Sequence, residues 1–522
     1  MFRFTNDRSS RSTGDGAKGK RAIVVGAGFG GIAAALRLRA RGYEVQLLDR
    51  LEAPGGRAQV YRRGGFVFDA GPTVVTAPFL FEELFELFGK RLEDYADIVP
   101  VEPWYRYQFP DGREFDYGGS LDDTLEQIRS FDERDAEGYK RLVDMSERIF
   151  DKGFTELADA PFHRFGAMMK TVPALLKLRS YKTVHQLVAS FIKSEHLRQA
   201  FCIHPLLVGG NPFDTTSIYS LIHFLERKWG IHFPMGGTGA IVNALGRLMG
   251  EEGVAFRGGA EVEELVVENG AARGVVLASG ERLSADLVVV NGDPPFLYKN
   301  MIDRRHRRRW TDRRVDRLKY SMGLFVLYFG TERKYPEVPH HTIVLGPRFK
   351  GLLDDIFHRQ TLADDFSVYL HRPTATDPSM APEGKDSFYA LVPVPNLDAD
   401  LDWDVEGPKL RDRLVSFLDE RILPGLSETI TEDFFVTPRT FESRFLSHKG
   451  SGFSIQPVFT QSAWFRFHNV SEDIDDLYLV GAGTHPGAGM PGVLCSAKVL
   501  DRVVPAPPRT TAVRARESAS AR

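Results

Sequence analysis

The chain has few cysteines and no long apolar run. Only Cys202 and Cys495 are cysteines among its 522 residues, and they stand too far apart for a zinc motif or a disulfide framework. This usage fits a reducing cytoplasm, which is the compartment we expect. The longest apolar stretch, residues 22–36, ends at Arg37 and is too short to span a bilayer. Any membrane contact should therefore be peripheral.

The chain also lacks a strong net charge and an apolar leader. A net charge of −3 gives no general attraction to nucleic acid. Residues 1–20 are rich in Arg, Ser and Gly, which is unlike a secretory signal, and we predict disordered tails at 1–20 and 504–522. No zinc, cytochrome or G-x-S-x-G motif occurs, so we predict no metal. We expect the adjacent pair His340 and His341 to lie in an exposed loop rather than in a metal site.

What the chain does contain is a strand–loop–helix–strand pattern over residues 21–49. An apolar run is followed by Gly26, Gly28 and Gly31 in G-x-G-x-x-G spacing, and the second strand ends on Asp49. Gly26 permits a tight turn, Gly28 lets a pyrophosphate approach, and Gly31 lets helix and strand pack closely. The helix N-terminus offers free N–H groups to phosphates. Asp49 can accept hydrogen bonds from ribose hydroxyls, which favours FAD or NAD over NADP.

Further segments of the same type follow. Gly56 and Arg57 end an A-P-G-G-R loop, which offers close backbone approach and one fixed cation to phosphate oxygens. Alternating strands and a second glycine-rich loop follow later in the chain. We predict one discontinuous nucleotide-binding domain formed from residues 21–75, 235–293 and 475–503.

The remaining blocks, 76–234 and 294–474, are predicted to form an α+β substrate domain. Residues 105–117 look like a hairpin, and the pattern from 121 to about 200 is mainly helical. Strands are expected at 323–329, 367–370 and 387–392.

Four stretches of the chain resemble the bacterial and fungal type of phytoene desaturase, a group of the wider amine-oxidase-like FAD superfamily. They are residues 195–201, 207–213, 229–239 and 478–492. The last reads Y-L-V-G-A-G-T-H-P-G-A-G followed by P-G, which is similar to the family's C-terminal signature. The resemblance covers about residues 20–504. Cys495 departs from it, where glycine or serine is expected, and its small size implies no functional consequence.

The resemblance implies that the bound dinucleotide is FAD, and that the α/β fold combines a Rossmann-like FAD-binding domain with the substrate domain. Residues implied to hold the ADP half are Gly26, Gly28, Gly31, Asp49, Gly56 and Arg57. Val262 would lie near the adenine through its backbone. The residues implied to border the flavin end are Gly483, Gly489 and Met490.

The implied reaction is the introduction of successive C=C bonds into phytoene, towards neurosporene or lycopene, with oxygen or a quinone as terminal electron acceptor. It needs a hydride acceptor and a proton acceptor, and no side chain accepts hydride. We expect the proton acceptor to be His485, Glu442 or Asp293. His485 could instead be a loop histidine bonded to backbone, and Asp293 a turn or helix cap.

A long hydrocarbon substrate hardly visits water, because each buried CH₂ gains about 0.8 kcal/mol. The enzyme must therefore collect it from a membrane. Residues 161–194 contain no acidic residue, and they interleave six cations with apolar side chains, as a helix lying in a headgroup layer would. A core-packed helix with a solvated face is the alternative. We expect this region to associate with the inner face of the cell membrane.

Residues 304–310 form a second basic stretch, R-R-H-R-R-R-W. We expect this stretch to form a solvated helix face, and we do not expect nucleic acid as a partner. Three other functions remain open: a paralogous dehydrogenase acting on a later or hydroxylated carotenoid, a flavin amine oxidase, and a module that binds carotenoid without turnover.

Overall fold

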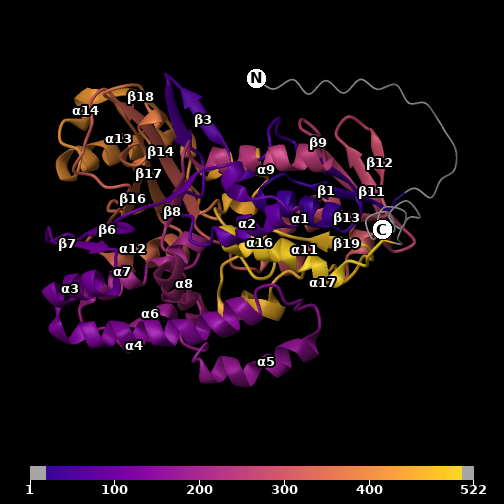
Figure 1. Cartoon of the computed structure of the whole chain (residues 1–522), viewed down its shortest axis with the longest axis horizontal. Helices are drawn as coiled ribbons and strands as arrows, with labels where there is room; N and C mark the ends of the chain where they lie inside the picture. The colour runs from indigo at the N-terminus through magenta and orange to yellow at the C-terminus, as the bar shows by residue number, and fades with distance from the viewer. Residues whose placement is uncertain (1–18, 508–522) are drawn as a thin grey trace, which may run out of the picture.

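The computed structural model describes residues 19–507 as two large sheets, several smaller ones and a block of helices (Figure 1). The two predicted tails, 1–20 and 504–522, fall almost entirely outside these residues. Within residues 19–507, no helix is long and apolar enough to cross a membrane. Both large sheets contribute to the wall of one cavity.

The first large sheet is parallel and has five strands in the order β19-β13-β1-β2-β9. The strands are β1 (Arg21–Val25), β2 (Glu44–Leu48), β9 (Ala255–Arg257), β13 (Leu287–Val290) and β19 (Leu477–Leu479). In β1, Ala22 and Val24 join one buried cluster and Ile23 joins another on the opposite face, because both faces of a parallel sheet are covered. Three distant parts of the chain thus share one sheet, while the boundaries assigned to that domain stay a prediction.

Helices and a smaller sheet cover this parallel sheet. α1 (Phe29–Ala40) connects β1 to β2 and packs against α2 (Phe79–Glu86), α9 (Thr238–Glu252) and α16 (Met490–Lys498), and α17 (Leu500–Val503) follows α16. A three-stranded antiparallel sheet consists of β10 (Val262–Glu268), β11 (Ala271–Leu277) and β12 (Arg282–Ser284). The sequence predicts strands at 254–257, 262–267, 274–278 and 287–290, and β12 lies outside all four.

The second large sheet is mixed and has seven strands in the order β18-β14-β17-β16-β15-β6-β7. They are β6 (Tyr105–Gln108), β7 (Glu114–Tyr117), β14 (Gly323–Thr331), β15 (His341–Val344), β16 (Val368–His371), β17 (Asp386–Val394) and β18 (Ile430–Val436). The predicted hairpin and the three predicted strands are confirmed. β15 and β18 have no counterpart in the prediction.

Side chains of β14 alternate between the two faces of this second sheet. Phe325 and Leu327 pack beneath α13 (Trp403–Arg421) in a buried cluster. Leu324 and Val326 point to the opposite face and line the cavity, as the two-residue period of a strand requires.

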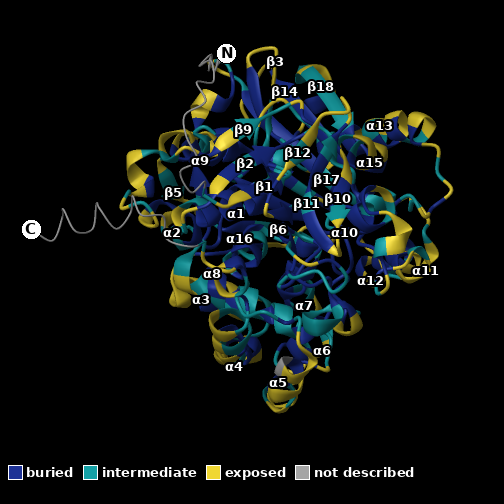
Figure 2. Cartoon of the chain, turned by 90° about the vertical axis from the view of Figure 1, so that its right-hand side faces the viewer, coloured by how far each residue is buried: buried dark blue, intermediate teal, exposed yellow. Residues whose placement is uncertain are grey.

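A block of helices lies below the two large sheets in the view of Figure 1. It comprises α3 (Leu121–Phe131), α4 (Glu133–Phe150), α5 (Phe165–Lys177), α6 (Val184–Val188), α7 (Glu195–Phe201) and α8 (Leu221–Trp229). Ser120 and Asp132 cap α3 and α4 through their side chains, and α4 packs along α8. α5 lies at the outer edge in both views (Figures 1 and 2).

Short elements complete the described chain. The short strands are β3 (Val60–Arg63), β4 (Phe66–Asp69), β5 (Ile98–Pro100) and β8 (His232–Pro234). The short helices are α10 (Pro294–Phe296), α11 (Asp312–Asp316), α12 (Phe349–Asp354), α14 (Leu426–Thr429) and α15 (Pro438–Phe445).

Candidate functional site

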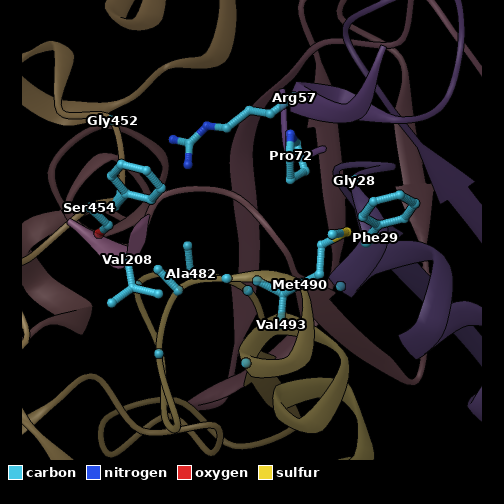
Figure 3. A pocket seen from close by; sticks show the side chains of 18 of the residues that line it. Gly28, Phe29, Arg57, Pro72, Val208, Gly452, Ser454, Ala482, Met490 and Val493 are labelled. Atoms are coloured by element: carbon cyan, nitrogen blue, oxygen red, sulfur yellow. The ribbon is translucent and has the colours of Figure 1, made fainter. Parts of the chain in front are cut away.

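A cavity of about 620 Å³ runs between the two large sheets (Figure 3). We call the part lined by residues 25–26, 28–30, 49–51, 55–58, 260–262 and 290–293 the nucleotide end. The apolar end is lined mainly by Phe154, Leu157, Leu175, Leu206, Leu207, Val208, Ile218, Ile222, Leu225, Leu324, Val326, Ile343 and Leu391. Residues 481–483 and 485–493 border the cavity where the two ends meet.

Two glycine loops stack at the nucleotide end. Gly28 forms a parallel bridge with Gly55, whose N–H donates to Ala27 O at 2.7 Å. A Cβ on Gly31 would lie 1.8 Å from Gly26 O, so only glycine lets the start of α1 pack so close to the turn after β1. The first turn of α1 therefore faces an open cradle, which fits a pyrophosphate.

Gly56 borders the same cradle. Its φ of +56° lies in the left-handed region, and a Cβ there would come within 3.2 Å of the Gly28 Cα atom. The second loop therefore depends on glycine for both its conformation and its close approach to the first.

Asp49 lies at the carboxyl end of β2 and is buried. Its Oδ2 accepts the Ala27 N–H at 2.6 Å, and its Oδ1 accepts the Leu51 N–H at 2.8 Å. Each carboxylate oxygen keeps a lone pair for a ribose hydroxyl. Burial raises the pKa of Asp49, and the two backbone hydrogen bonds act in the opposite direction.

Arg57 extends across the cavity from the second glycine loop (Figure 3). Its Nη2 donates to Ser447 Oγ at 2.6 Å. Burial lowers the pKa of Arg57, and the nearby Asp293 carboxylate acts in the opposite direction. The guanidinium is thus held inside the cavity, where it can meet phosphate oxygens.

Asp293 lines the cavity but both of its oxygens have partners. Oδ1 accepts the Ser454 hydroxyl at 2.5 Å, and Oδ2 accepts the His448 N–H at 2.8 Å. Burial is the main cause of its raised pKa. Asp293 therefore fixes the loop that carries Ser454, and it does not act as a helix cap through its side chain.

The C-terminal loop borders the junction of the two ends. Gly483, Gly489 and Met490 all line the cavity, as does Val262 on the nucleotide side. Gly489 precedes α16 with a φ of +91°, so the first turn of that helix faces the cavity (Figure 3). Free N–H groups there favour a negative charge on a bound group.

Arg466, which sequence reasoning missed, holds this loop in place. It is 1% exposed and donates to Ala482 O at 2.7 Å and Thr484 O at 3.0 Å. Asn291, also missed as a functional residue, donates to Gly26 O at 3.2 Å. No motif signalled either role, because their partners lie outside the local stretch: 16 and 18 residues away for Arg466, and 265 residues away for Asn291.

His485 lines the cavity and is 5% exposed. Its Nε2 lies 2.9 Å from Leu157 O and donates to it, while Nδ1 has no hydrogen-bond partner within residues 19–507. The ring packs against Phe162. Burial lowers the pKa of His485 to about 4, so the imidazole is neutral at pH 7. The expected backbone bond is present, and one ring nitrogen remains free to accept a proton.

Glu442, one of the two carboxylate candidates for the proton acceptor, does not reach the cavity. It lies in α15, is exposed, and does not line the cavity. The helix turns it outward, while its neighbour Phe441 faces the cavity.

The apolar end also holds a few buried polar groups. Thr73 Oγ1 lies 2.7 Å from Tyr389 OH and 3.1 Å from Tyr369 OH. Glu226, which no motif signalled, lines the cavity wall, and its Oε2 lies 2.8 Å from His204 Nε2. These groups are hydrogen-bonded to one another, so the apolar end of the cavity remains suited to a hydrocarbon.

Residues 161–194 have two different faces. Met168 and Leu175 of α5 line the apolar end of the cavity. Phe165, Met169, Leu176 and Tyr181 are more than half exposed, and they are four of the eight exposed large hydrophobic side chains in the described chain. The cations of this stretch have no carboxylate partner among the ion pairs of residues 19–507: Arg164, Lys170, Lys177, Arg179, Lys182 and Lys193.

The basic stretch 304–310 is only partly the solvated helix face that we expected, because Arg304, Arg305 and Arg308 are exposed while other residues of the stretch are buried. Arg307 and Trp310 are buried, and Arg307 pairs with Asp312 at 2.7 Å. Arg304, Arg305 and Arg309 also have carboxylate partners. The tertiary structure therefore neutralises most of this charge.

The expectation that His340 and His341 lie in an exposed loop is wrong. They are 2% and 0% exposed, and His341 begins β15. His371 of the neighbouring strand β16 lies directly opposite His341. Burial lowers the pKa values of all three, that of His371 to about 3, so the rings are neutral at pH 7.

Comparison with known proteins agrees with this geometry. The family model of flavin-containing amine oxidoreductases matches residues 29–498. The phytoene desaturase (lycopene-forming) of Pseudescherichia vulneris is 50% identical over 481 residues, covering 92% of this chain and 98% of that protein. The phytoene desaturase (neurosporene-forming) of Rhodobacter capsulatus is 43% identical, covering 94% of each chain.

Solved structures share the fold at low sequence identity. Wild-type putrescine oxidase bound to putrescine has a TM-score of 0.60 at 14% identity, covering 93% of this chain and 99% of that one. An oxidoreductase from Methanosarcina mazei has a TM-score of 0.60 at 17% identity, covering 92% and 100%. The Rossmann-like part of the predicted fold is thereby confirmed, while a membrane-associating helical region stays a prediction.

Proposed function

The chain belongs to the flavin-containing amine oxidoreductases and, among them, to the phytoene desaturases, and we propose that it desaturates phytoene in carotenoid biosynthesis. It is an FAD-dependent oxidoreductase that acts on CH–CH groups. The cradle formed by Gly28, Gly31 and Gly56, with Asp49 and Arg57 beside it, fits the ADP half of FAD.

One observation carries the proposal: the nucleotide end and the apolar end belong to the same cavity. A hydrocarbon in the apolar end can therefore reach a flavin held at the junction without entering water. Bound FAD supplies the hydride acceptor that no side chain can provide. The chain's own residues bind the substrate, exclude water and take up the proton.

We keep His485 as the proposed proton acceptor. It borders the junction, its ring is neutral at pH 7, and Nδ1 has a free lone pair. Its low pKa makes it a weak base, but a C–H beside a carbon that has lost hydride is strongly acidic. Full turnover by His485→Gln would remove this role.

The exposed face of α5 supports docking at the inner face of the cell membrane. Its inner face lines the apolar end, so the exposed Phe165, Met169 and Leu176 lie on the outer side of the cavity wall. The unpaired cations around them would each gain roughly 1 kcal/mol near an anionic leaflet. Substrate could then pass from lipid to cavity beside α5.

The reaction is tested anaerobically with the flavin-loaded protein and phytoene in liposomes. We expect flavin bleaching together with new conjugated polyene absorption, and the band positions count the double bonds. Bleaching only with a later or hydroxylated carotenoid would move the enzyme to another step. Bleaching only with amines would overturn the proposal in favour of an amine oxidase. Admitting oxygen or a quinone afterwards identifies the acceptor.

Membrane docking is tested by co-sedimentation with anionic liposomes. We expect binding that weakens with salt, and that weakens further in a Lys170→Gln, Lys177→Gln, Arg179→Gln variant. The matched control is Arg304→Gln, Arg305→Gln, Arg308→Gln, which removes the same charge from the other basic stretch. Equal loss of binding in both variants would contradict a specific role of α5.

A further inference from the structure

A second cluster of chemically reactive side chains lies behind the cavity wall and has no part in the reaction above. His340 and His341 stand at the start of β15, His371 at the end of β16, and Asp69 at the end of β4. All four are at most 2% exposed. They lie outside every motif discussed for FAD or substrate.

Unpaired polar atoms meet in this cluster. Nε2 of His340 and of His341, both ring nitrogens of His371, and Oδ2 of Asp69 are buried without a hydrogen-bond partner in the described chain. One ligand-type nitrogen from each histidine lies within 4.8 Å of the others, and Asp69 Oδ2 is 3.5 Å from His371 Nε2. Native proteins rarely leave such groups unpaired, and an ion or water is the usual explanation.

The other ring nitrogens of two histidines are held in place. His340 Nδ1 lies 2.6 Å from Thr376 Oγ1, and His341 Nδ1 lies 2.7 Å from Tyr369 OH. A hydrogen bond on one ring nitrogen fixes the ring and leaves the other nitrogen for a ligand, as the partners of metal-bound histidines do. Asp69 is held in the same way, because its Oδ1 accepts the Thr238 N–H at 2.8 Å.

From this geometry we propose that His340, His341, His371 and Asp69 bind one divalent first-row transition metal ion, with zinc as the best fit. The three imidazole nitrogens lie together, and Asp69 Oδ2, which is close to His371 alone, would have to turn toward the other two to complete a four-coordinate set of the kind zinc takes. The ring centroids are 4.4–5.4 Å apart. In tetrahedral coordination the ligand atoms stand about 3.4 Å apart, whereas the three nitrogens lie within 4.8 Å of one another, so the side chains would rotate inward on binding an ion.

The surrounding charges accommodate a cation. Asp69 contributes one negative charge when it is a ligand. Arg372, a cation whose charge acts on His340, is already paired with Asp386 at 2.9 Å, and Thr374 donates to the same carboxylate. Arg372 therefore does not oppose a metal ion with an unbalanced charge.

The site would join the two halves of the cavity wall. His341 and His371 belong to the seven-stranded sheet, while Asp69 bonds to the N-terminus of α9 beside the parallel sheet. Ala70, which follows Asp69, lines the cavity. Since the ligands are buried and no position is left for substrate, the ion acts as a structural tie. This inference does not depend on the identity of the substrate.

The test is metal analysis of the full-length, flavin-loaded protein, purified without a polyhistidine tag and passed over a chelating resin. We expect one equivalent of zinc, or of another first-row divalent ion, per chain by mass spectrometry. The variants His371→Asn and His340→Asn should lose it. The matched control, His358→Asn, alters an exposed histidine paired with Asp214 and should keep it.

Two further measurements keep the proposal falsifiable if a variant does not fold. Protein made in cobalt-supplemented medium should show tetrahedral Co²⁺ absorption at longer wavelength than the flavin. The ion should resist EDTA in the native protein and be released to a chromogenic chelator on unfolding. Wild-type protein free of first-row metals, or variants at both histidines that retain the metal, would overturn the proposal.

Discussion

The two ends of the cavity are built in opposite ways. The nucleotide end consists mostly of backbone, brought together by glycines that lie a few residues apart and by the acid that ends the next strand. The apolar end consists of single side chains from many segments, among them α5, α8, β14, β15, β17 and the segments at 154–157 and 206–218. One end therefore depends on a few positions where a side chain cannot be added, and the other on the shared character of many positions.

This difference predicts how each end tolerates change. A Cβ on Gly31 or Gly56 meets backbone atoms of the first glycine turn, which cannot move without shifting α1 or β1. A changed side chain at the apolar end meets other side chains, which can repack. We expect mutations at the first end to act on folding and cofactor retention, and mutations at the second to act on turnover.

The largest effect is expected for Gly31→Ala. Its Cβ would overlap Gly26 O, so we expect a loss of about 3 kcal/mol or more in unfolding free energy and loss of bound FAD. Gly246→Ala is the matched control: it lies within α9 with nothing within 4 Å of the added Cβ. For each variant, the flavin absorbance per protein measures bound FAD, and thermal unfolding measures stability. Retention of flavin by Gly31→Ala would contradict the claim that the nucleotide end cannot accept an added side chain.

Arg57→Met should weaken FAD binding without unfolding the protein. Hydrogen bonds to charged groups contribute about 1.5–3 kcal/mol, so roughly ten- to hundredfold weaker binding is expected on titration of apoprotein with FAD. Arg308→Met changes an exposed arginine and should leave FAD binding unchanged. Equal FAD affinity in both variants would show that the phosphates do not need this cation.

His485 lies where the two ends meet, and its low pKa predicts a pH dependence of stability. The folded-state pKa is about 4 against 6.5 in the unfolded chain. The unfolded state therefore binds the proton more readily, and stability should fall by about 2 kcal/mol from pH 7 to pH 5.

The matching variant is His485→Gln, which keeps an N–H donor for Leu157 O. We expect its denaturant midpoint to change less between pH 7 and pH 5 than that of the wild type. The difference should correspond to the stability that protonation of His485 removes from the wild type. Identical pH profiles would mean that His485 is not held neutral by burial.

The smallest effect is expected for Ile222→Gln at the apolar end. Ile222 is half-buried in α8 and lines the cavity. Placing an amide against a hydrocarbon costs about 1–3 kcal/mol, so turnover of phytoene should fall roughly tenfold while flavin content is unchanged. Ile222→Leu keeps the apolar character and should retain most of the activity. Loss of flavin in Ile222→Gln would contradict the expectation that mutations at the apolar end affect turnover and leave cofactor retention unchanged.

Sequence reasoning was most successful where the chemistry is local. The glycines at 26–31, the strand ends and Asp49 lie within a short stretch, and their spacing alone predicts a βαβ unit with a phosphate site. The C-terminal loop carries its own signature and does border the cavity. In both cases neighbouring residues impose the backbone conformation, so no distant partner has to be known.

The sequence-based predictions failed where the burial of a residue and its partners depend on distant parts of the chain. Glu442 and Phe441 are adjacent, yet only the packing of α15 decides that the acid faces outward. The run at 304–310 looks like free positive charge, but its partners include Glu472, which lies far along the chain. Arg466 and Glu226 carry no local signature at all.

The sequence by itself determined the nucleotide-binding pattern, the resemblance to desaturases and the basic amphipathic stretch at 161–194, because each rests on residues close together in the chain. Only the tertiary structure decided that one cavity joins the FAD cradle to an apolar end. Likewise, it alone placed His371 opposite His341, with Asp69 beside them. Strand register and helix packing set those contacts, and they join segments that lie from dozens to hundreds of residues apart.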